Sequence, residues 1–138
     1  MDGSSANDFQ GVTFAFVCVD KGSARSEIFD LLVSLGIPFI DVGMGLNRKQ
    51  GALSGAIRAT YYSANDAAKV RNMQLAEMAD DPDDMYRSNV QISELNALNA
   101  SVAMVRYKQL RGFYVEESAI YHFLMGIENM RTFTESAS

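Results

Sequence analysis

Residues 12–46 read VTFAFVCVDKGSARSEIFDLLVSLGIPFIDVGMGL, and this stretch decides the fold. Its first part, Val12–Val19, is apolar almost without interruption, which is typical of a strand that is buried on both faces of a parallel sheet. Ser23 follows as a helix N-cap, and apolar residues then recur at i, i+3, i+4 and i+7 over Ile28–Leu35. Gly36 supplies the left-handed residue at which this helix is expected to end.

A second apolar segment, Phe39–Val42, begins directly after Pro38. A strand, a helix and a strand within about thirty residues form a right-handed βαβ unit, so the two strands should be parallel. Gly43-Met-Gly45 comes next, but it lacks the third glycine and the following helix of a dinucleotide-binding fingerprint. We therefore interpret these glycines as positions of close backbone approach or of a bend.

The pattern changes to alternation over Leu53–Tyr61, which predicts a strand that is half exposed. Such a strand favours a sheet that turns antiparallel or mixed at this point. Its solvent side would carry three polar residues: Ser54, Arg58 and Thr60.

Two helices and a β-pair are expected in the remainder. The first helix begins at Ser63–Asp66 and ends at the acidic run Asp80–Asp84. A capping-box pattern at Ser88–Gln91 introduces a long helix over Val90–Arg111. Strand propensity returns in two segments, Ala119–Met125 and Ile127–Phe133.

These elements predict an α/β fold, namely a partial Rossmann-like, three-layer domain with a βαβ unit and a mixed parallel and antiparallel sheet. We expect residues 9–134 to form this domain. Residues 1–8 are interpreted as a disordered tail or a cloning remnant, and residues 135–138 as a second tail.

The composition excludes several classes of function. The chain has 138 residues and a formal net charge of −5, so it lacks the basic face that nucleic-acid binding needs. No apolar run approaches the roughly 20 residues of a membrane span, and no leader peptide is recognised. The single cysteine excludes an internal disulfide and a cysteine-based zinc site. We expect a soluble, cytoplasmic protein that binds neither nucleic acid nor membranes.

Asp20 is the strongest candidate for chemistry, because it stands at the carboxyl end of the first strand, immediately before a helix. A carboxylate at this position could hold a magnesium ion, and Arg25 could reach a phosphate from the helix. Position alone favours the alternative, in which Asp20 caps the turn and Arg25 faces water.

Four other polar residues invite interpretation. Cys18 lies inside the apolar run and is expected to be a buried small hydrophobe. His122 has no second histidine with which to share a metal, so a surface or packed strand histidine is expected. Asn96 and Asn99 lie one turn apart in the long helix, where amides are poor helix formers, and they indicate a polar contact across an interface or into a cleft.

The first strand and helix resemble the middle of a ThiF-type adenylyltransferase, the superfamily of MoeB and the ubiquitin-activating enzymes. In that family a hydrophobic strand ends in an aspartate, here Asp20, and an arginine follows five residues later, here Arg25. The helix then leads to a tail that Gly36–Gly43 (GIPFIDVG) matches. Asn89–Ala100 resembles the family's long helix, so the resemblance covers roughly Phe9–Phe113.

The resemblance implies an ATP-dependent enzyme that activates the C-terminal carboxylate of a ubiquitin-like or sulfur-carrier protein. ATP and magnesium would be its cofactors, with Asp20 binding Mg-ATP and Arg25 as a weaker ATP contact. Zinc is not expected, because the cysteine pairs of zinc-binding members are absent. Thioester formation is not expected either, because no cysteine lies between Tyr62 and Asn89. The carrier would lie on the sheet face formed by Ala52–Tyr62, with exposed aromatic residues at Tyr61 and Tyr62.

The resemblance reaches only the C-terminal half of such an enzyme, because the family's phosphate-binding half, with its glycine-rich turn, has no counterpart before Phe9. This chain alone is therefore expected to be inactive. The alternative function is a non-catalytic dimerisation or protein-binding scaffold. A homodimer is expected in both cases, because half of a doubly wound domain leaves apolar faces uncovered, chiefly at Val90–Arg111 and Ala52–Tyr62.

Overall fold

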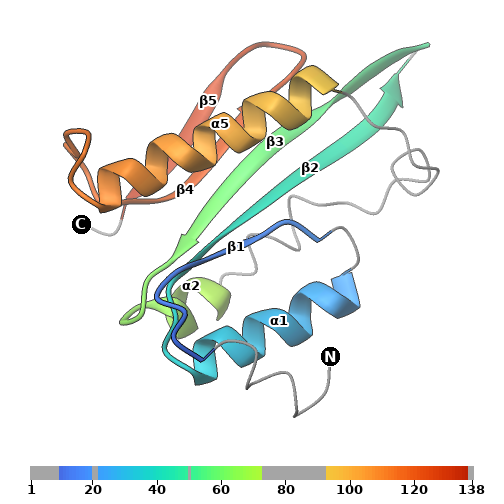
Figure 1. Ribbon diagram of the computed structural model, residues 1–138. Coiled ribbons are helices and arrows are strands. Elements are labelled where there is room, and N and C mark those ends of the chain that lie inside the picture. Colours follow the sequence, from blue (N-terminus) through green and yellow to red (C-terminus); the bar gives the residue numbers. More distant parts are fainter. Residues whose placement is uncertain (1–9, 20–21, 50, 73–92, 137–138) are drawn as a thin grey trace.

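The computed structural model describes residues 10–19, 22–49, 51–72 and 93–136. Their elements follow the chain in this order: β1 (Ala15–Val17), α1 (Gly22–Ser34), β2 (Phe39–Lys49), β3 (Ala52–Tyr62), α2 (Ala67–Asn72), α5 (Ser93–Leu110), β4 (Ile120–Gly126) and β5 (Thr132–Ser136). The strands form a five-stranded sheet in the order β1-β2-β3-β4-β5 (Figure 1). The predicted tail at residues 1–8 and the acidic run at residues 80–84 lie outside the described residues.

The predicted βαβ unit is confirmed, because β1 and β2 pair in parallel from Ala15 opposite Phe39 to Val17 opposite Asp41. The end of α1 also agrees with the sequence. Gly36 has a φ of 69°, its N–H donates to Val33 O, and the N–H of Ile37 donates to Leu32 O. These two bonds satisfy carbonyls at the helix end that would otherwise lack partners. Only three residues of the long apolar run belong to β1, so this strand is shorter than predicted.

β2 is much longer than predicted. It continues through Gly43-Met-Gly45 and the polar residues beyond, as far as Lys49. The reason is its antiparallel pairing with β3, which runs unbroken from Phe39 opposite Tyr62 to Lys49 opposite Ala52 and satisfies the backbone of both strands. The glycine pair therefore lies within a strand, and the carbonyl of Gly45 lies close to the backbone of Gly55 on β3.

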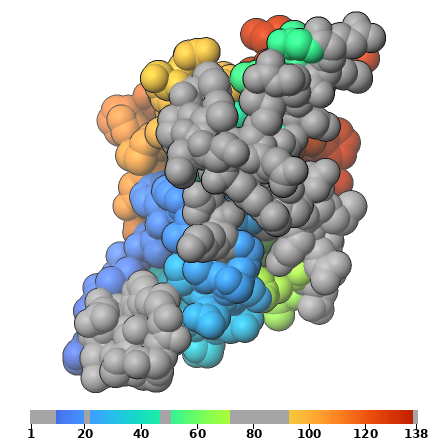
Figure 2. Space-filling view, turned by 90° about the vertical axis from the view of Figure 1, so that its right-hand side faces the viewer, coloured from blue at the N-terminus to red at the C-terminus, as the bar shows by residue number. Residues whose placement is uncertain are grey.

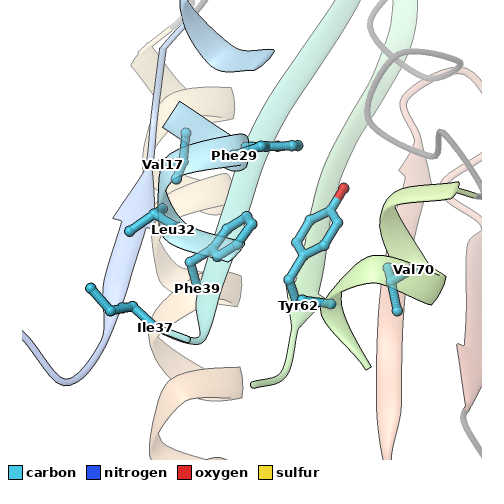
Figure 3. Packing of buried hydrophobic residues seen from close by; sticks show 8 residues of the cluster. Val17, Phe29, Leu32, Ile37, Phe39, Tyr62 and Val70 are labelled. Carbon is cyan, nitrogen blue, oxygen red and sulfur yellow. The ribbon is translucent and has the colours of Figure 1, made fainter. Parts of the chain in front are cut away.

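Helices cover both faces of the sheet, which confirms the predicted three-layer α/β arrangement. On one face α1 and α2 pack against β1, β2 and β3 (Figures 1 and 3). This cluster includes Phe29, Leu32, Phe39, Tyr62 and Val70, and the rings of Phe39 and Tyr62 stack 4.5 Å apart. In Figure 2, α1 and α2 lie in the lower part of the molecule, while the β2–β3 hairpin tip reaches the top.

The opposite face of the sheet carries α5. Ala103 of this helix is buried with Ile40 and Ala59, and partly buried residues surround them: Phe14, Val42, Tyr61, Val102, Tyr107, Leu110 and Phe123. α5 begins at Ser93 and ends at Leu110, close to the predicted bounds, and residues 90–92 lie outside the description.

The polar side of β3 is not exposed to solvent, contrary to the prediction. Ser54, Arg58 and Thr60 are all buried, and Tyr62 is fully buried as well. β3 has α1 and α2 on one face and α5 on the other, so neither of its faces is left to solvent. Tyr62 therefore cannot serve as the exposed contact that the family resemblance suggested, and Tyr61 is partly buried.

The C-terminal β-pair is confirmed as antiparallel, but β5 lies later in the chain than predicted. It reaches Ser136 and so includes two residues that had been assigned to a tail. One of them, Glu135, accepts a hydrogen bond of 2.7 Å from the hydroxyl of Tyr121. None of the described helices is both long and apolar enough to span a membrane.

Gly55 of β3 provides a test of the hairpin register. Its φ is 145°, and a Cβ at this position would overlap the carbonyl oxygen of Gly45 on β2. We expect Gly55→Ala to lower the free energy of unfolding by about 2 kcal/mol or more, measured by urea denaturation, because both the backbone and the strand pairing become strained.

Gly22→Ala is the matched control. A Cβ on Gly22, the first residue of α1, would meet nothing within 4 Å. This variant should stay within about 0.5 kcal/mol of the wild type. Equal losses in the two variants would contradict the close approach of β2 and β3.

Candidate functional site

The candidate site predicted from the sequence, Asp20 with Arg25, follows the carboxyl end of β1 in the chain. Asp20 lies outside the described residues, so its role stays a prediction. Residues on either side are described: Val19 follows β1, and Gly22 opens α1. The turn at which the family resemblance places Mg-ATP therefore connects the parallel strand to the helix.

Arg25 of α1 lies at this turn, and it does not face water. The residue is 6% exposed, and its Nη2 donates a hydrogen bond of 2.9 Å to Val19 O. Its Nε lies 3.7 Å from Oδ1 of Asp41 on β2. Arg25 thus connects the start of α1 to the end of β1 and to β2. A role in phosphate binding remains a prediction.

Asp41 and Arg58 form the centre of a buried charged cluster. Asp41 is 0% exposed and Arg58 is 1% exposed, and their Oδ2 and Nη2 atoms are 2.5 Å apart. Nη1 of Arg58 also donates to the carbonyl of Asp41 and to Oγ1 of Thr60. Arg58 lies opposite Gly43 in the sheet, and the missing side chain there leaves room for the guanidinium to turn along β2 toward Asp41.

The cluster continues across the sheet to His122 of β4. Asp41 pairs with Thr60, and Thr60 pairs with His122, so the three side chains share one face. Thr60 Oγ1 and His122 Nδ1 are 3.0 Å apart. Oγ1 also accepts from Arg58, and which of Thr60 and His122 donates to the other depends on the tautomer of the imidazole.

Burial lowers the pKa of His122 below its ordinary value, and the positive charge of Arg58 lowers it further, while Glu135 acts in the opposite direction. The imidazole is therefore held neutral. This agrees with the prediction of a packed strand histidine.

The Asp41 carboxylate is expected to be important for stability. Its removal would leave the buried guanidinium groups of Arg25 and Arg58 without this carboxylate, and such a loss costs about 3–5 kcal/mol in comparable buried pairs.

The cluster of Asp41, Arg58 and Thr60 was not predicted from the sequence. A signal was present, because Asp41 interrupts the apolar strand FIDV and polar residues alternate along β3. Alternation was interpreted as solvent exposure, although polar residues on neighbouring central strands can instead bind one another.

A cleft of about 360 Å³ lies on the other face of the sheet, between the end of β1, β2 and α5. Asn99 is buried within it, and its Nδ2 donates to Gly43 O at 2.9 Å, whereas Asn96 is exposed. The prediction that these amides contact an interface or a cleft is confirmed for the cleft.

Cys18 also lines this cleft, and it is exposed rather than buried. The reason is that β1 ends at Val17, so Cys18 lies beyond the paired residues. Partial desolvation raises the pKa of its thiol, and the Asp41 carboxylate raises it further. A thiol with a raised pKa is a poor nucleophile at neutral pH. Within the described ranges, no three His, Cys, Asp or Glu residues gather as metal ligands would.

Comparison with known proteins gives a likeness of fold. No protein-family model and no curated protein matches the sequence. Among solved structures, the chain is similar to the crystal structure of selenomethionine PaaA, with a TM-score of 0.55 and 14% sequence identity. The match covers 99% of this chain and 46% of the PaaA chain, so this chain spans about half the length of that protein.

His122 should make stability depend on pH. Its pKa in the folded state lies below the ordinary value of 6.5, so the unfolded chain binds the proton more readily. The free energy of unfolding therefore includes the full contribution of neutral His122 at pH values above 6.5. This contribution is lost as the pH falls from 6.5 toward the lower pKa of the folded state. In urea denaturation from about pH 8 to about pH 5, the non-titrating variant His122→Asn should lose less stability than the wild type. Parallel pH profiles for the two proteins would contradict the assignment.

Proposed function

We propose that this chain is the C-terminal portion of a ThiF-type, ATP-dependent adenylyltransferase of the cytoplasm. Its substrate would be the C-terminal carboxylate of a ubiquitin-like or sulfur-carrier protein. One observation carries the proposal: the stretch that resembles this family coincides with the β1-α1-β2 unit, which contains the only parallel strand pair among the described strands. In the sequence the family's aspartate follows this parallel strand, and open α/β sheets bind ligands at the carboxyl ends of their strands.

The contacts of Arg25 support this proposal. An arginine that donates to Val19 O fixes the backbone just before position 20, and its approach to Asp41 ties that backbone to β2. A turn held in this way would keep its carboxylate in place with little loss of entropy on binding. Arg25 would then act as a positioning residue for Asp20, in addition to any weaker contact with ATP.

The family resemblance assigns the magnesium to Asp20. Asp41 is already bonded to Arg58, and it would not serve as a magnesium ligand while it holds that bond. A single carboxylate fits, because magnesium in nucleotide sites is usually held by one or two carboxylates together with substrate phosphates. When bound, magnesium would neutralise charge on those phosphates.

In the proposed reaction the carrier's carboxylate oxygen attacks the α-phosphorus of ATP, and the bond to pyrophosphate breaks. The product is an acyl adenylate. This chain would supply the carboxylate side of the site, and a phosphate-binding half would supply the backbone amides that hold the phosphates. The chain alone would then be inactive.

Pyrophosphate exchange tests the proposal in a polypeptide that also carries a phosphate-binding half. We expect Asp20→Asn to reduce carrier-dependent ATP–pyrophosphate exchange by about a hundredfold or more, because the metal contact is lost. The exposed neighbour Glu27→Gln serves as the control and should keep full exchange. Unchanged exchange in Asp20→Asn, or no exchange in the unmodified protein, would contradict the proposal.

A second candidate function, the non-catalytic dimerisation scaffold, is favoured by exposed apolar residues along α5. Leu98, Met104 and Val105 of this helix are 36%, 43% and 48% exposed. Apolar residues that are exposed together are often covered by a partner. We propose that a second copy of this chain covers these residues.

Sedimentation velocity tests the scaffold candidate. The wild type should sediment as a dimer, and Val105→Lys should shift it to a monomer because a charge is placed in the proposed interface. Leu35→Lys is the matched control, since Leu35 is similarly exposed at 43% but follows α1 on the other face of the sheet. A monomeric wild type, or equal dissociation in both variants, would argue against dimerisation through α5.

A further inference from the structure

The residues that line the cleft beside α5 are suited to binding an uncharged ligand. Most of its lining residues are apolar, and they come from the end of β1, from β2 and from α5: Phe16, Val19, Val42, Met44, Ala100, Ala103 and Met104. The remaining ones are Cys18, Gly43, Asn96 and Asn99, so no described lining residue carries a charge. Its volume of about 360 Å³ lies within the usual range for small-molecule sites.

Asn99 supplies an acceptor without a partner. The residue is 7% exposed, and its Nδ2 donates to Gly43 O at 2.9 Å. This bond fixes the orientation of the amide and leaves Oδ1 as a pure acceptor. Oδ1 is buried and has no hydrogen-bond partner within the described part of the chain. Buried acceptors of this kind are rare in folded proteins, because water cannot replace the missing bond.

The chemistry of a matching ligand follows from these contacts. It must present a hydrogen-bond donor to Asn99, and it should be neutral there because the described lining offers no counter-charge. Phe16 and Met104 are partly exposed, and Met44 is buried. An aromatic ring and thioethers pack well against a flat ring. We infer that this cleft binds a neutral, planar heterocycle that carries an amino group, with Asn99 Oδ1 accepting from that group.

This inference rests on the cleft and not on the proposed adenylyltransferase activity. The cleft lies on the α5 face, whereas the cluster of Arg25, Asp41 and Arg58 lies on the α1 face. The proposed ligand binding in the cleft can therefore be wrong while the proposed adenylyltransferase activity is right, and the reverse. Ligand binding can also be measured without catalysis.

Cys18 serves as a built-in reporter, because it is the only cysteine of the sequence and lines the same cleft. The probe is adenosine, and the comparison is purine riboside, which differs only by lacking the amino group. We expect adenosine to slow the alkylation of Cys18 by iodoacetamide at mildly alkaline pH. Half-maximal protection should need about tenfold more purine riboside, because that nucleoside leaves Oδ1 without its donor.

Variants separate the acceptor from the cleft itself. Asn99→Leu should remove the preference for adenosine over purine riboside. Ser101→Leu, an exposed position of α5 outside the cleft lining, is the control and should keep the preference. Because Asn99→Leu also breaks the bond to Gly43, Met104→Trp provides an independent check at a partly exposed position. The larger side chain should fill the cleft and abolish protection by both nucleosides. No protection of the wild type, equal protection by both nucleosides, or a preference that survives Asn99→Leu would overturn the inference.

Discussion

The ion pair between Asp41 and Arg58 constrains more of this molecule than any other contact. Both groups are withdrawn from water, so each must find its partners inside the protein. Arg58 can reach Asp41 because Gly43 stands opposite it, and it reaches Thr60 on its own strand. The long register between β2 and β3 is therefore specified by charge as well as by pairing, because a slip of one residue would turn Arg58 to the other face.

The same carboxylate links the sheet to its helical layer. Arg25 lies between Asp41 and Val19 O, so the first turn of α1 is positioned by a charge on β2 and a carbonyl at the end of β1. Aromatic packing of Phe29 on Phe39 and Tyr62 then fixes the rest of the helix. The other face differs in kind, because α5 packs through apolar residues and its main polar contact to β2 is that of Asn99.

The βαβ unit could be predicted from the sequence because its signals are local. The apolar run, the helical spacing and Gly36 each act within a few residues. The extent of β2 could not be predicted in this way, because glycines and polar residues do not favour strands and only the pairing with β3 keeps them extended. Arg58 and Thr60 were assigned to solvent for a similar reason. Their burial depends on contacts with Asp41 and His122, which are distant in sequence. Alternation of polar and apolar residues alone does not distinguish a solvent-exposed face of a strand from a buried polar face.

The β2–β3 hairpin and β1 should form at different stages of folding, because their strand pairings differ in length. β2 and β3 are neighbours in sequence and pair along their whole length, so little chain entropy is lost when their hairpin closes. β1 pairs with β2 over only three residues, and it does so across the intervening helix α1. The hairpin should therefore form early, and β1 should dock late and open first in local unfolding. The edge of the sheet next to Cys18 is consequently the part of the described molecule best able to adjust when another polypeptide segment or a ligand binds.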